Sequence, residues 1–425
     1  MRRIAFHTLG CKVNQYDTQA MLESFQAAGW QVCEFGEDAD AYLINTCTVT
    51  GTGDRKSLRL IRHVHGEHPQ AAIIVTGCLA QRVPEQVALP GVKLVLGTAK
   101  RAQVVELLER ALQGDGCLIE VNPLKGAAFE PLTVNSHEGH TRATMKIQEG
   151  CDRYCSYCII PYVRGPVRSL ELGAVEREAA RLGAAGYAEI VVTGIHLTSY
   201  GRGMDCELCD ALDAVSCAPG VRRIRLGSLE PYYVTEERAQ RLAGMPKLCR
   251  QFHLSMQSGS AGVLERMHRR YTPEEYAHSV ELLRQYMPGC AITTDVIAGF
   301  PGETEEEARE TLRFIERIGF SRIHVFPYSQ RAGTVAARLP GQVPVDVKRR
   351  RTAELIELGG RLSAAYQRAA LGSVREVLLE EEVAPGLCEG YTREYLRVRA
   401  QGVPGEIVNL RLTDISEDSM LGVRE

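Results

Sequence analysis

Short apolar stretches alternate with helical patterns along the first part of the chain. The strand-like stretches are RIAFHTL, AYLINTC, AAIIVTGC and VKLVLGT. Apolar residues recur with the spacing of amphipathic helices over 17–28 and 101–113. Because strands that alternate with helices pack as a parallel sheet covered by helices, the pattern predicts a small parallel α/β sheet domain over residues 1–113.

A second alternating series begins near residue 141, after a stretch in which the periodicity fades. Pro123, Gly126, Pro131, Asn135 and Gly139 gather in that stretch, so 114–140 is predicted to be a linker. The strand-like stretches that follow are ATMKIQ, EIVVTG, RIRLGS, QFHLS, AITTDVIAG and RIHVFPYS. Six such units predict a parallel barrel or partial barrel over 141–371, with its functional site at the C-terminal ends of the strands.

The last part of the chain changes character. A long helical pattern runs over 346–370 and is followed by short strand-like stretches with turn residues between them. These stretches are VREVLLEEEV, YLRVRA and EIVNLRLTDI. They predict a small all-β barrel over 372–425. The chain as a whole is therefore expected to be an α/β protein with three folded parts.

The composition narrows the class of protein. The net charge is −3, from 50 Lys+Arg against 53 Asp+Glu, which excludes a globally basic nucleic-acid binder but leaves room for a local basic patch. No apolar stretch approaches the ~18 residues of a membrane span. The first residues, MRRIAFHTLG, lack the apolar core of a secretory signal. We therefore expect a cytoplasmic protein with no membrane association.

The 14 cysteines are many for a chain with no export signal. Because disulfides are disfavoured in a reducing cytosol, metal or redox chemistry is the favoured explanation. Cys151, Cys155 and Cys158 have the spacing C-x3-C-x2-C and follow a strand-like stretch. Three thiolates this close can hold three irons of a [4Fe–4S] cluster and leave the fourth iron open to a substrate. A zinc knuckle is the alternative, although zinc usually takes four ligands.

A second trio, Cys11, Cys47 and Cys78, is far apart in sequence, but each cysteine follows a predicted strand. Parallel strand ends lie together, so the three thiols are candidates for convergence. Three separately buried thiols are an equally good interpretation of the residues alone. Cys206 and Cys209 have C-x2-C spacing without a second pair nearby and are expected to be loop or core thiols.

Both trios resemble the cluster-binding motifs of the radical S-adenosylmethionine (SAM) methylthiotransferases. The resemblance rests on TLGCKVNQYDTQ, NTC, TGC and GCDRYCSYCIIPYVRG, and it extends over essentially the whole chain. It implies an N-terminal methylthiotransferase domain, a radical SAM (β/α)6 partial barrel and a C-terminal, OB-like TRAM barrel. It also implies two [4Fe–4S] clusters. The Cys151, Cys155 and Cys158 cluster would bind SAM, and the Cys11, Cys47 and Cys78 cluster would carry the sulfur.

The resemblance also implies an activity. The motif TLGCKVNQYDTQ resembles that of the family branch that adds a methylthio group to C2 of N6-threonylcarbamoyladenosine at tRNA position 37. Two SAM molecules would be used per product, and an external electron donor such as flavodoxin or ferredoxin would be needed. The same-class alternatives are methylthiolation of N6-isopentenyladenosine or of a ribosomal-protein aspartate. The different-class alternative is a non-catalytic iron–sulfur protein that binds RNA.

Two sets of binding residues follow from these expectations. The residues that the resemblance places near SAM are Tyr157, Thr193, Gly194, Ser228, Glu230, Gln257 and Gly299. Core packing of Tyr157 and ordinary strand-end glycines are the competing interpretations. The candidate contacts to the tRNA anticodon stem-loop are basic residues, although each basic group alone is typical of a solvated face. They are Arg55, Lys56, Arg59, Arg62, Arg164, Arg168, Arg269, Arg270, Arg393 and Arg397.

Overall fold

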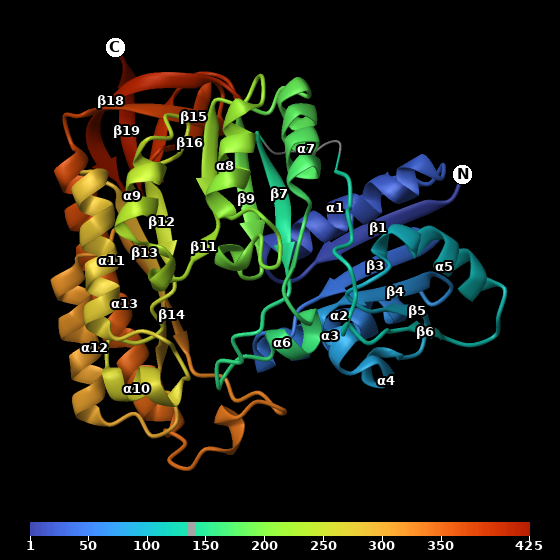
Figure 1. The fold of residues 1–425 in the computed structure, drawn as a ribbon. Coiled ribbons are helices and arrows are strands. Elements are labelled where there is room, and N and C mark those ends of the chain that lie inside the picture. The colour runs from blue at the N-terminus through green and yellow to red at the C-terminus, as the bar shows by residue number, and fades with distance from the viewer. Residues whose placement is uncertain (135–140) are drawn as a thin grey trace.

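The computed structural model describes residues 1–134 and 141–425, so two of the predicted linker residues, Asn135 and Gly139, lie outside the described residues. Figure 1 shows an N-terminal α/β sheet (blue) beside a larger partial barrel (green to orange), with a small β-barrel (red) at one end of the partial barrel. The α/β class and the closed C-terminal barrel are confirmed.

The N-terminal sheet has six parallel strands in the order β2-β1-β3-β4-β5-β6. The strands are β1 (Arg3–Thr8), β2 (Gln31–Cys33), β3 (Ala41–Thr46), β4 (Ala72–Gly77), β5 (Val92–Leu96) and β6 (Leu118–Glu120). The helices are α1 (Lys12–Ala27), α2 (Gly51–Glu67), α3 (Cys78–Arg82), α4 (Pro84–Val87) and α5 (Val104–Leu112). An apolar core lies on each face of the sheet, which explains why β3 and β4 are buried throughout.

The sheet is larger than the sequence pattern indicates. β2 and β6 have three residues each, none fully buried, so neither carries the apolar run of a central strand. β6 lies inside the predicted linker 114–140 and pairs with β5, so the first part of that segment belongs to the sheet. The division at 1–113, 114–140, 141–371 and 372–425 remains a proposal.

The central domain has six principal parallel strand positions, divided between two four-stranded sheets. The first sheet contains β7 (Arg142–Glu149), β8 (Arg168–Ser169), β9 (Glu189–Gly194) and β10 (Arg223–Leu226). The second contains β11 (Ser228–Leu229), β12 (Gln251–Leu254), β13 (Ala291–Ala298) and β14 (Arg322–Pro327). The predicted strand RIRLGS is split into β10 and β11 at Gly227, where the chain passes from one sheet to the other. The partial barrel is thus confirmed.

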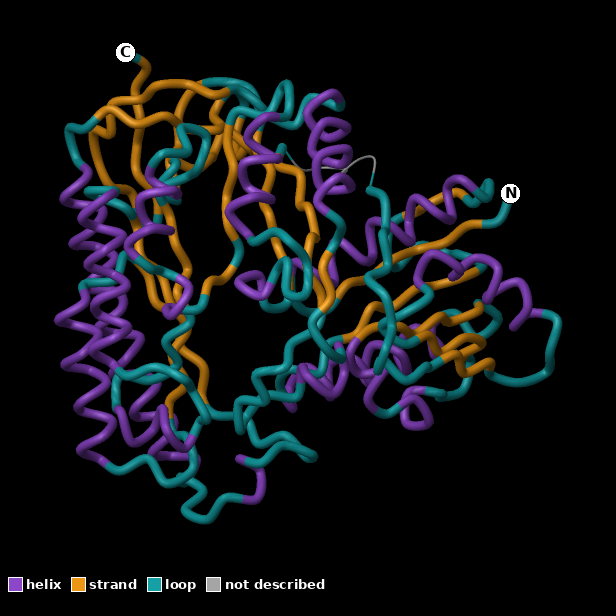
Figure 2. Tube along the Cα trace, in the orientation of Figure 1, coloured by secondary structure: helices purple, strands orange, loops and turns teal. Residues whose placement is uncertain are grey.

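Helices cover the outside of this barrel, as Figure 2 shows. They are α7 (Leu172–Ala184), α8 (Leu208–Cys217), α9 (Glu236–Ala243), α11 (Pro273–Tyr286), α12 (Glu305–Ile318) and α13 (Val345–Ala370). The short helices α6 (Ile160–Arg164) and α10 (Ala261–Arg266) lie beyond the strand ends, and α6 packs on α3 of the N-terminal sheet. Single 3₁₀ turns lie at η1 (Arg101–Gln103), η2 (Leu197–Ser199), η3 (Pro231–Tyr233) and η4 (Ala336–Arg338). α11 and α12 begin with complete capping boxes, Thr272 with Glu275 and Thr304 with Glu307.

Alternation along the strands separates two faces of the barrel. Ala143, Met145 and Ile147 of β7 pack in the core beneath the outer helices. Lys146 and Gln148 therefore project from the opposite face. We call the side of the strands turned away from the covering helices the inner face. The same alternation puts apolar residues of β9, β10 and β12 under the helices, so the outer face supplies the hydrophobic core.

The C-terminal barrel closes one end of the partial barrel. It consists of β15 (Val374–Ala384), β16 (Leu387–Thr392), β17 (Arg397–Gln401), β18 (Ile407–Ser416) and β19 (Ser419–Arg424), paired in the order β15-β16-β17-β19-β18. Tyr391 and Tyr395 stack with ring centroids 4.5 Å apart. Arg142 lies over both rings, and Arg225 lies 4.7 Å from the Tyr395 centroid. The tyrosine pair therefore packs on cations near the N-terminal ends of β7 and β10.

No helix in the described part of the chain is long and apolar enough to cross a membrane.

Gly183 of α7 tests how tightly that helix is packed, and Gly66 of α2 is the comparison. A Cβ at Gly183 would stand 2.0 Å from the Pro219 carbonyl oxygen, whereas a Cβ at Gly66 in α2 would meet no atom within 4 Å. We expect Gly183→Ala to lower the free energy of unfolding by about 1–3 kcal/mol, because backbone must move. Gly66→Ala should raise it by roughly 0.5–1 kcal/mol through helix propensity. Urea unfolding of both variants measures this, and equal shifts would contradict it.

Candidate active site at the facing strand ends

The first trio of cysteines lies on a loop that directly follows β7. Gly150 starts the turn with φ +77°, and a Cβ there would stand 1.9 Å from the Pro166 carbonyl oxygen. Only glycine fits this close approach without moving backbone. The Cys151 N–H then donates to the Gly165 carbonyl at 2.9 Å. The strand end and the turn thus fix where the cysteine loop begins.

The middle of the loop is held by Ser156. Its N–H donates to the Met267 carbonyl at 3.0 Å, and its Oγ donates to the Arg266 carbonyl at 2.7 Å. The Ser156 carbonyl accepts from the Ala336 N–H at 2.7 Å. Residues after β12 and β14 therefore clamp the loop between Cys155 and Cys158, which orders the thiols before any ligand binds.

The three thiols of this loop influence one another electrostatically. Burial and then the neighbouring Cys155 charge raise the pKa of Cys158 to about 12 and contribute to raising that of Cys151 to about 11. An Arg269 guanidinium nitrogen lies 3.6 Å from the Cys155 Sγ. Thiols that resist ionisation when alone become thiolates when a metal supplies the positive charge. The donor set therefore fits an iron–sulfur cluster.

The second trio follows three neighbouring strands of the N-terminal sheet. Cys11 follows β1 and precedes α1, Cys47 follows β3, and Cys78 is the first residue of α3 after β4. These strands are adjacent in the order β1-β3-β4, so their carboxyl ends share one edge. The charges of Cys11 and Cys47 both act on the Cys78 thiol. The structure thus brings the three thiols together.

Gly10 permits this convergence. Its φ is +115°, and a Cβ there would stand 3.0 Å from the Cys47 Cβ and 3.2 Å from its Sγ. Cys11 is exposed, whereas Cys78 is buried and accepts a hydrogen bond at 3.2 Å from the Arg164 Nε. Burial raises the pKa of the Cys78 thiol to about 11, and Arg164 opposes that rise. A buried thiol beside a guanidinium is a fitting cluster ligand.

No three thiol, imidazole or carboxylate groups converge on a single metal ion within 1–134 and 141–425. A cubane cluster places a different demand on its ligands, because each of its cysteines binds a different iron rather than one shared ion.

Five charged side chains are buried where the N-terminal sheet meets the barrel. They are Asp17 of α1, Arg101 of η1, Lys146 and Glu149 of β7, and Arg164 of α6, and we call them the buried charge cluster. Glu149 accepts at 3.1 Å from both Arg101 and Lys146, and Arg164 donates to Asp17 at 3.0 Å. Burial alone would raise the pKa of each carboxyl, but the three cations hold the pKa of both below its ordinary value.

A second contact joins the two domains on the other side of the barrel. Arg331, in the segment after β14, donates to Thr48 at 2.7 Å and to Asp54 at 2.6 Å. Arg82 of α3 donates to the Ala332 carbonyl at 2.8 Å. The sheet edge that carries the second trio is therefore held from both the first and the last strand of the barrel.

Three of the basic residues assigned to tRNA binding are already engaged inside the protein. Arg164 is fully buried in the charge cluster, and Arg269 is paired with Glu230 at 2.6 Å with 5% of its side chain exposed. Arg393 donates to the Leu248 carbonyl at 2.8 Å and so attaches the C-terminal barrel to the central domain. Arg164 and Arg269 are too buried in this structure to contact tRNA, because each is paired with a residue distant in sequence. Arg393 is partly exposed and stays a prediction.

The other basic residues remain candidates. Arg55, Lys56, Arg59 and Arg62 are exposed along α2, which starts just after Cys47. Arg270 is exposed as well. Arg168 and Arg397 are partly exposed, and Arg397 pairs with Glu389. These residues stay predictions.

The residues assigned to SAM lie at or near the C-terminal strand ends, with Tyr157 on the cysteine loop itself. They are Tyr157, Thr193, Gly194, Ser228, Glu230, Gln257 and Gly299. Several also have a packing role. A Cβ at Gly194 would stand 2.8 Å from the Gln148 Cβ, and Gly299 has φ +73°. Tyr157 packs against the apolar group around Phe300. Their contacts to SAM therefore remain predictions.

His196 lies beside these strand ends, although the sequence motifs do not assign it to the site. Its N–H donates to the Gln148 Oε1 at 2.6 Å, and its Nδ1 lies 2.5 Å from the Ser199 Oγ. Burial, and then the Arg153 charge, lower the pKa of His196 to about 4. A neutral imidazole at this position orients its neighbours without adding charge.

The alternation of charged and apolar residues in the barrel strands predicts a charged inner face. In RIRL of β10, Arg223 and Arg225 alternate with apolar residues, although an all-parallel barrel strand is usually apolar on both faces. His253 of β12 and His324 of β14 follow the same rule, and their rings lie 6.0 Å apart. Such alternation indicates a polar inner face.

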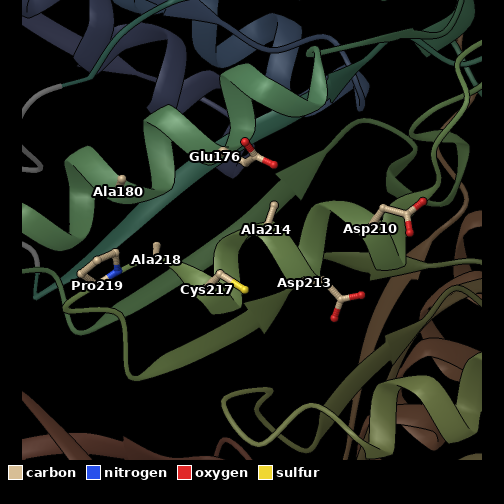
Figure 3. A pocket seen from close by; sticks show the side chains of 8 residues that line it. All are labelled: Glu176, Ala180, Asp210, Asp213, Ala214, Cys217, Ala218 and Pro219. Carbon is tan, nitrogen blue, oxygen red and sulfur yellow. The ribbon is translucent and has the colours of Figure 1, made fainter.

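A hollow on the opposite side of the barrel lies between α7 and α8 (Figure 3). The residues lining it are Glu176, Ala180, Asp210, Asp213, Ala214, Cys217, Ala218 and Pro219. It lies on the helical side, away from the cysteine loops. Cys209 is buried with its Sγ 3.3 Å from the Tyr233 hydroxyl, as expected for a core thiol.

Two family models match the chain. The model of the uncharacterized protein family UPF0004 matches residues 3–97, and that of the radical SAM superfamily matches residues 145–315. The first range contains the Cys11, Cys47 and Cys78 trio, and the second contains the C-x3-C-x2-C loop.

Curated relatives are similar over almost the whole chain. The threonylcarbamoyladenosine tRNA methylthiotransferase MtaB of Bacillus subtilis (strain 168) is 42% identical over 97% of this chain and 94% of its own. The protein of that name from Thermotoga maritima is 36% identical, over 100% and 97%. The tRNA-2-methylthio-N(6)-dimethylallyladenosine synthase of Syntrophomonas wolfei is 34% identical, over 98% and 96%.

Solved structures share the fold. The radical SAM methyltransferase TsrM from Kitasatospora setae, with cobalamin and a [4Fe-4S] cluster bound, has a TM-score of 0.59 at 15% identity and covers 91% of this chain and 80% of its own. At this identity the likeness concerns the fold alone.

The buried charge cluster generates a stability prediction. Arg164→Met should lower the free energy of unfolding by about 3–5 kcal/mol, because it removes one partner of a buried ionic network. The matched control is Arg313→Met, which removes a surface partner of Glu306 and should leave the urea midpoint unchanged. Equal midpoints for Arg164→Met and the control would show that the cluster does not stabilise the domain contact.

Proposed function

Because the chain belongs to the radical SAM tRNA methylthiotransferases, we propose that it converts N6-threonylcarbamoyladenosine at tRNA position 37 into its 2-methylthio derivative. The observation that carries this proposal is the pairing of two cysteine trios at facing strand ends in a chain 42% identical to a threonylcarbamoyladenosine tRNA methylthiotransferase. The relative that acts on dimethylallyladenosine is less similar, at 34%. That difference favours the threonylcarbamoyl substrate.

The proposal includes two [4Fe–4S] clusters with different ligands. Cys151, Cys155 and Cys158 would hold the cluster that binds SAM, and the trio around Cys78 would hold the second. The support is that each trio forms its own group, on its own strand ends, with its own buried cation nearby. When bound, the clusters and SAM supply a radical strong enough to open the non-acidic C2–H bond of adenine and a sulfur to replace the hydrogen.

The protein's own residues would position the base and exclude water. The buried charge cluster and Arg331 join the two domains and so would hold the two trios in position relative to each other. Tyr391 and Tyr395 close the far end of the barrel. A reactive radical needs such an enclosure, because water and oxygen would otherwise intercept it.

The anticodon stem-loop would approach along α2. Arg55, Lys56, Arg59 and Arg62 are exposed on this helix, whose first turn follows Cys47 and contacts the segment after β14. Phosphate contacts from these side chains would place position 37 near the second trio. We further propose that a small carrier such as flavodoxin or ferredoxin supplies the electrons.

Cysteine variants separate the two proposed clusters. Cys155→Ala should abolish anaerobic release of 5′-deoxyadenosine from SAM, because no complete three-thiolate site remains. Cys47→Ala should keep that release but form no methylthio product. Iron should fall from about eight per chain to about four in either variant. The control Cys217→Ala removes an exposed thiol on the outer hollow and should change neither readout. Loss of SAM cleavage in Cys47→Ala with four irons retained would refute this division of labour.

The substrate is tested with anticodon stem-loops that differ only at position 37. The reconstituted protein should add a methylthio group to the N6-threonylcarbamoyladenosine loop, detected by mass spectrometry of the nucleosides, and leave the N6-isopentenyladenosine loop unmodified. The reverse preference would assign the chain to the dimethylallyl branch. SAM cleavage without either product would favour a different acceptor, such as a ribosomal-protein aspartate.

A further inference from the structure

The inner face of the barrel carries arginines that are already engaged by other groups of the protein. Glu189, at the N-terminal end of β9, is bound by Arg223 and Arg225, each at 2.8 Å. Arg142 pairs with Glu380 at 2.9 Å and, like Arg225, packs on the tyrosine pair. The protein's own carboxylates and aromatic rings therefore hold these arginines.

Lys12 is different. It is the first residue of α1, directly after Cys11, and α1 packs against β7 and β9. This packing places Lys12 beside the inner face, where Arg142, Arg225, Tyr395 and the anion Glu189 are its electrostatic neighbours. Lys12 is accessible to solvent, and within residues 1–134 and 141–425 it has no ion pair and no side-chain hydrogen bond.

The start of α1 adds to this positive site. Cys11 is the N-cap, and it makes no side-chain cap hydrogen bond to the first turn. The first N–H groups of a helix are unpaired and carry the positive end of the helix dipole. An anion beside Lys12 would therefore meet both an ammonium and free backbone donors.

The proposed substrate has an anion in a matching place. C2 and C6 of adenine both flank N1, so the group on N6 and the atom that receives sulfur lie on the same edge of the base. The threonylcarbamoyl group ends in a carboxylate. If C2 faces the Cys11, Cys47 and Cys78 trio, this carboxylate points to the neighbourhood of the same cysteines. Lys12, which directly follows Cys11, is a cation next to this trio.

We propose that the Lys12 ammonium binds the carboxylate of the N6 substituent and so selects a target adenosine that carries an acidic N6 group. This inference rests on the proposed function and makes Lys12 a specificity-determining residue. An isopentenyl group or an unmodified N6 amine leaves the ammonium unpaired and gains nothing from it.

The test compares two stem-loops, one with N6-threonylcarbamoyladenosine and one with unmodified adenosine at position 37. For wild type, Lys12→Gln, Lys12→Arg and Lys125→Gln, we would measure the dissociation constant of each loop, and kcat/KM for the methylthio product by mass spectrometry. Lys125 is an exposed lysine in the segment between β6 and β7 and serves as the matched charge-removal control.

Lys12→Gln should lose roughly 10- to 100-fold in affinity and kcat/KM for the threonylcarbamoyl loop, the range of one charge-assisted hydrogen bond, without weakening binding of the unmodified loop. Lys12→Arg should keep most of the preference, and Lys125→Gln should match wild type.

Two results would overturn the inference while the proposed function stands. One is a wild type that methylthiolates the threonylcarbamoyl loop with a preference that Lys12→Gln leaves unchanged. The other is an equal loss on both loops, which would mean a structural role. A wild type that modifies only the isopentenyl loop would overturn the proposed function first and the inference with it.

Discussion

The contact on which the site depends is a group of buried charges, not an apolar patch. Asp17, Arg101, Lys146, Glu149 and Arg164 come from both domains and form ion pairs with one another. Removing charges from water costs several kcal/mol per ion, and only closely matched geometry offsets that cost. An apolar contact would tolerate sliding between the domains, whereas this cluster is favourable in one arrangement only. The relative position of the two cysteine trios is therefore set by electrostatics.

Single residues of the buried charge cluster lie next to both cysteine trios. Arg164 donates to the Cys78 thiol on one side and belongs to the helix that follows the C-x3-C-x2-C loop on the other. Glu149 is the last residue of β7, two positions before Cys151. A displacement of either partner would change the surroundings of both groups of thiols. The domain interface and the candidate active site are thus one structural unit, built where two parallel sheets turn their carboxyl ends toward each other.

The parts of the fold and site that the sequence predicts are those encoded locally. The strands β3, β4 and β13 are long or strongly apolar, and the C-x3-C-x2-C loop needs only its own spacing. The convergence of Cys11, Cys47 and Cys78 depends on strand order, which the residues alone left open. The burial of Arg164 could not be predicted from the sequence. Its motif is typical of a solvated basic residue, because its partner Asp17 lies 147 positions away. Charge is visible in a sequence, whereas the burial of a charge is a tertiary property.

Stability and chemistry are divided between the two faces of the partial barrel. Beneath the outer helices lies the apolar core that stabilises the domain, so the inner face is free to carry charged and polar side chains. A polar inner face is costly in a closed barrel, because each unsatisfied group would lose its water. Here the N-terminal domain and the tyrosine pair border that face, and its arginines Arg142, Arg223 and Arg225 are each paired with a carboxylate. Lys12 differs from these arginines, because among the described residues it is an accessible cation without an ion pair beside a candidate cluster ligand, which fits a partner that arrives with the substrate.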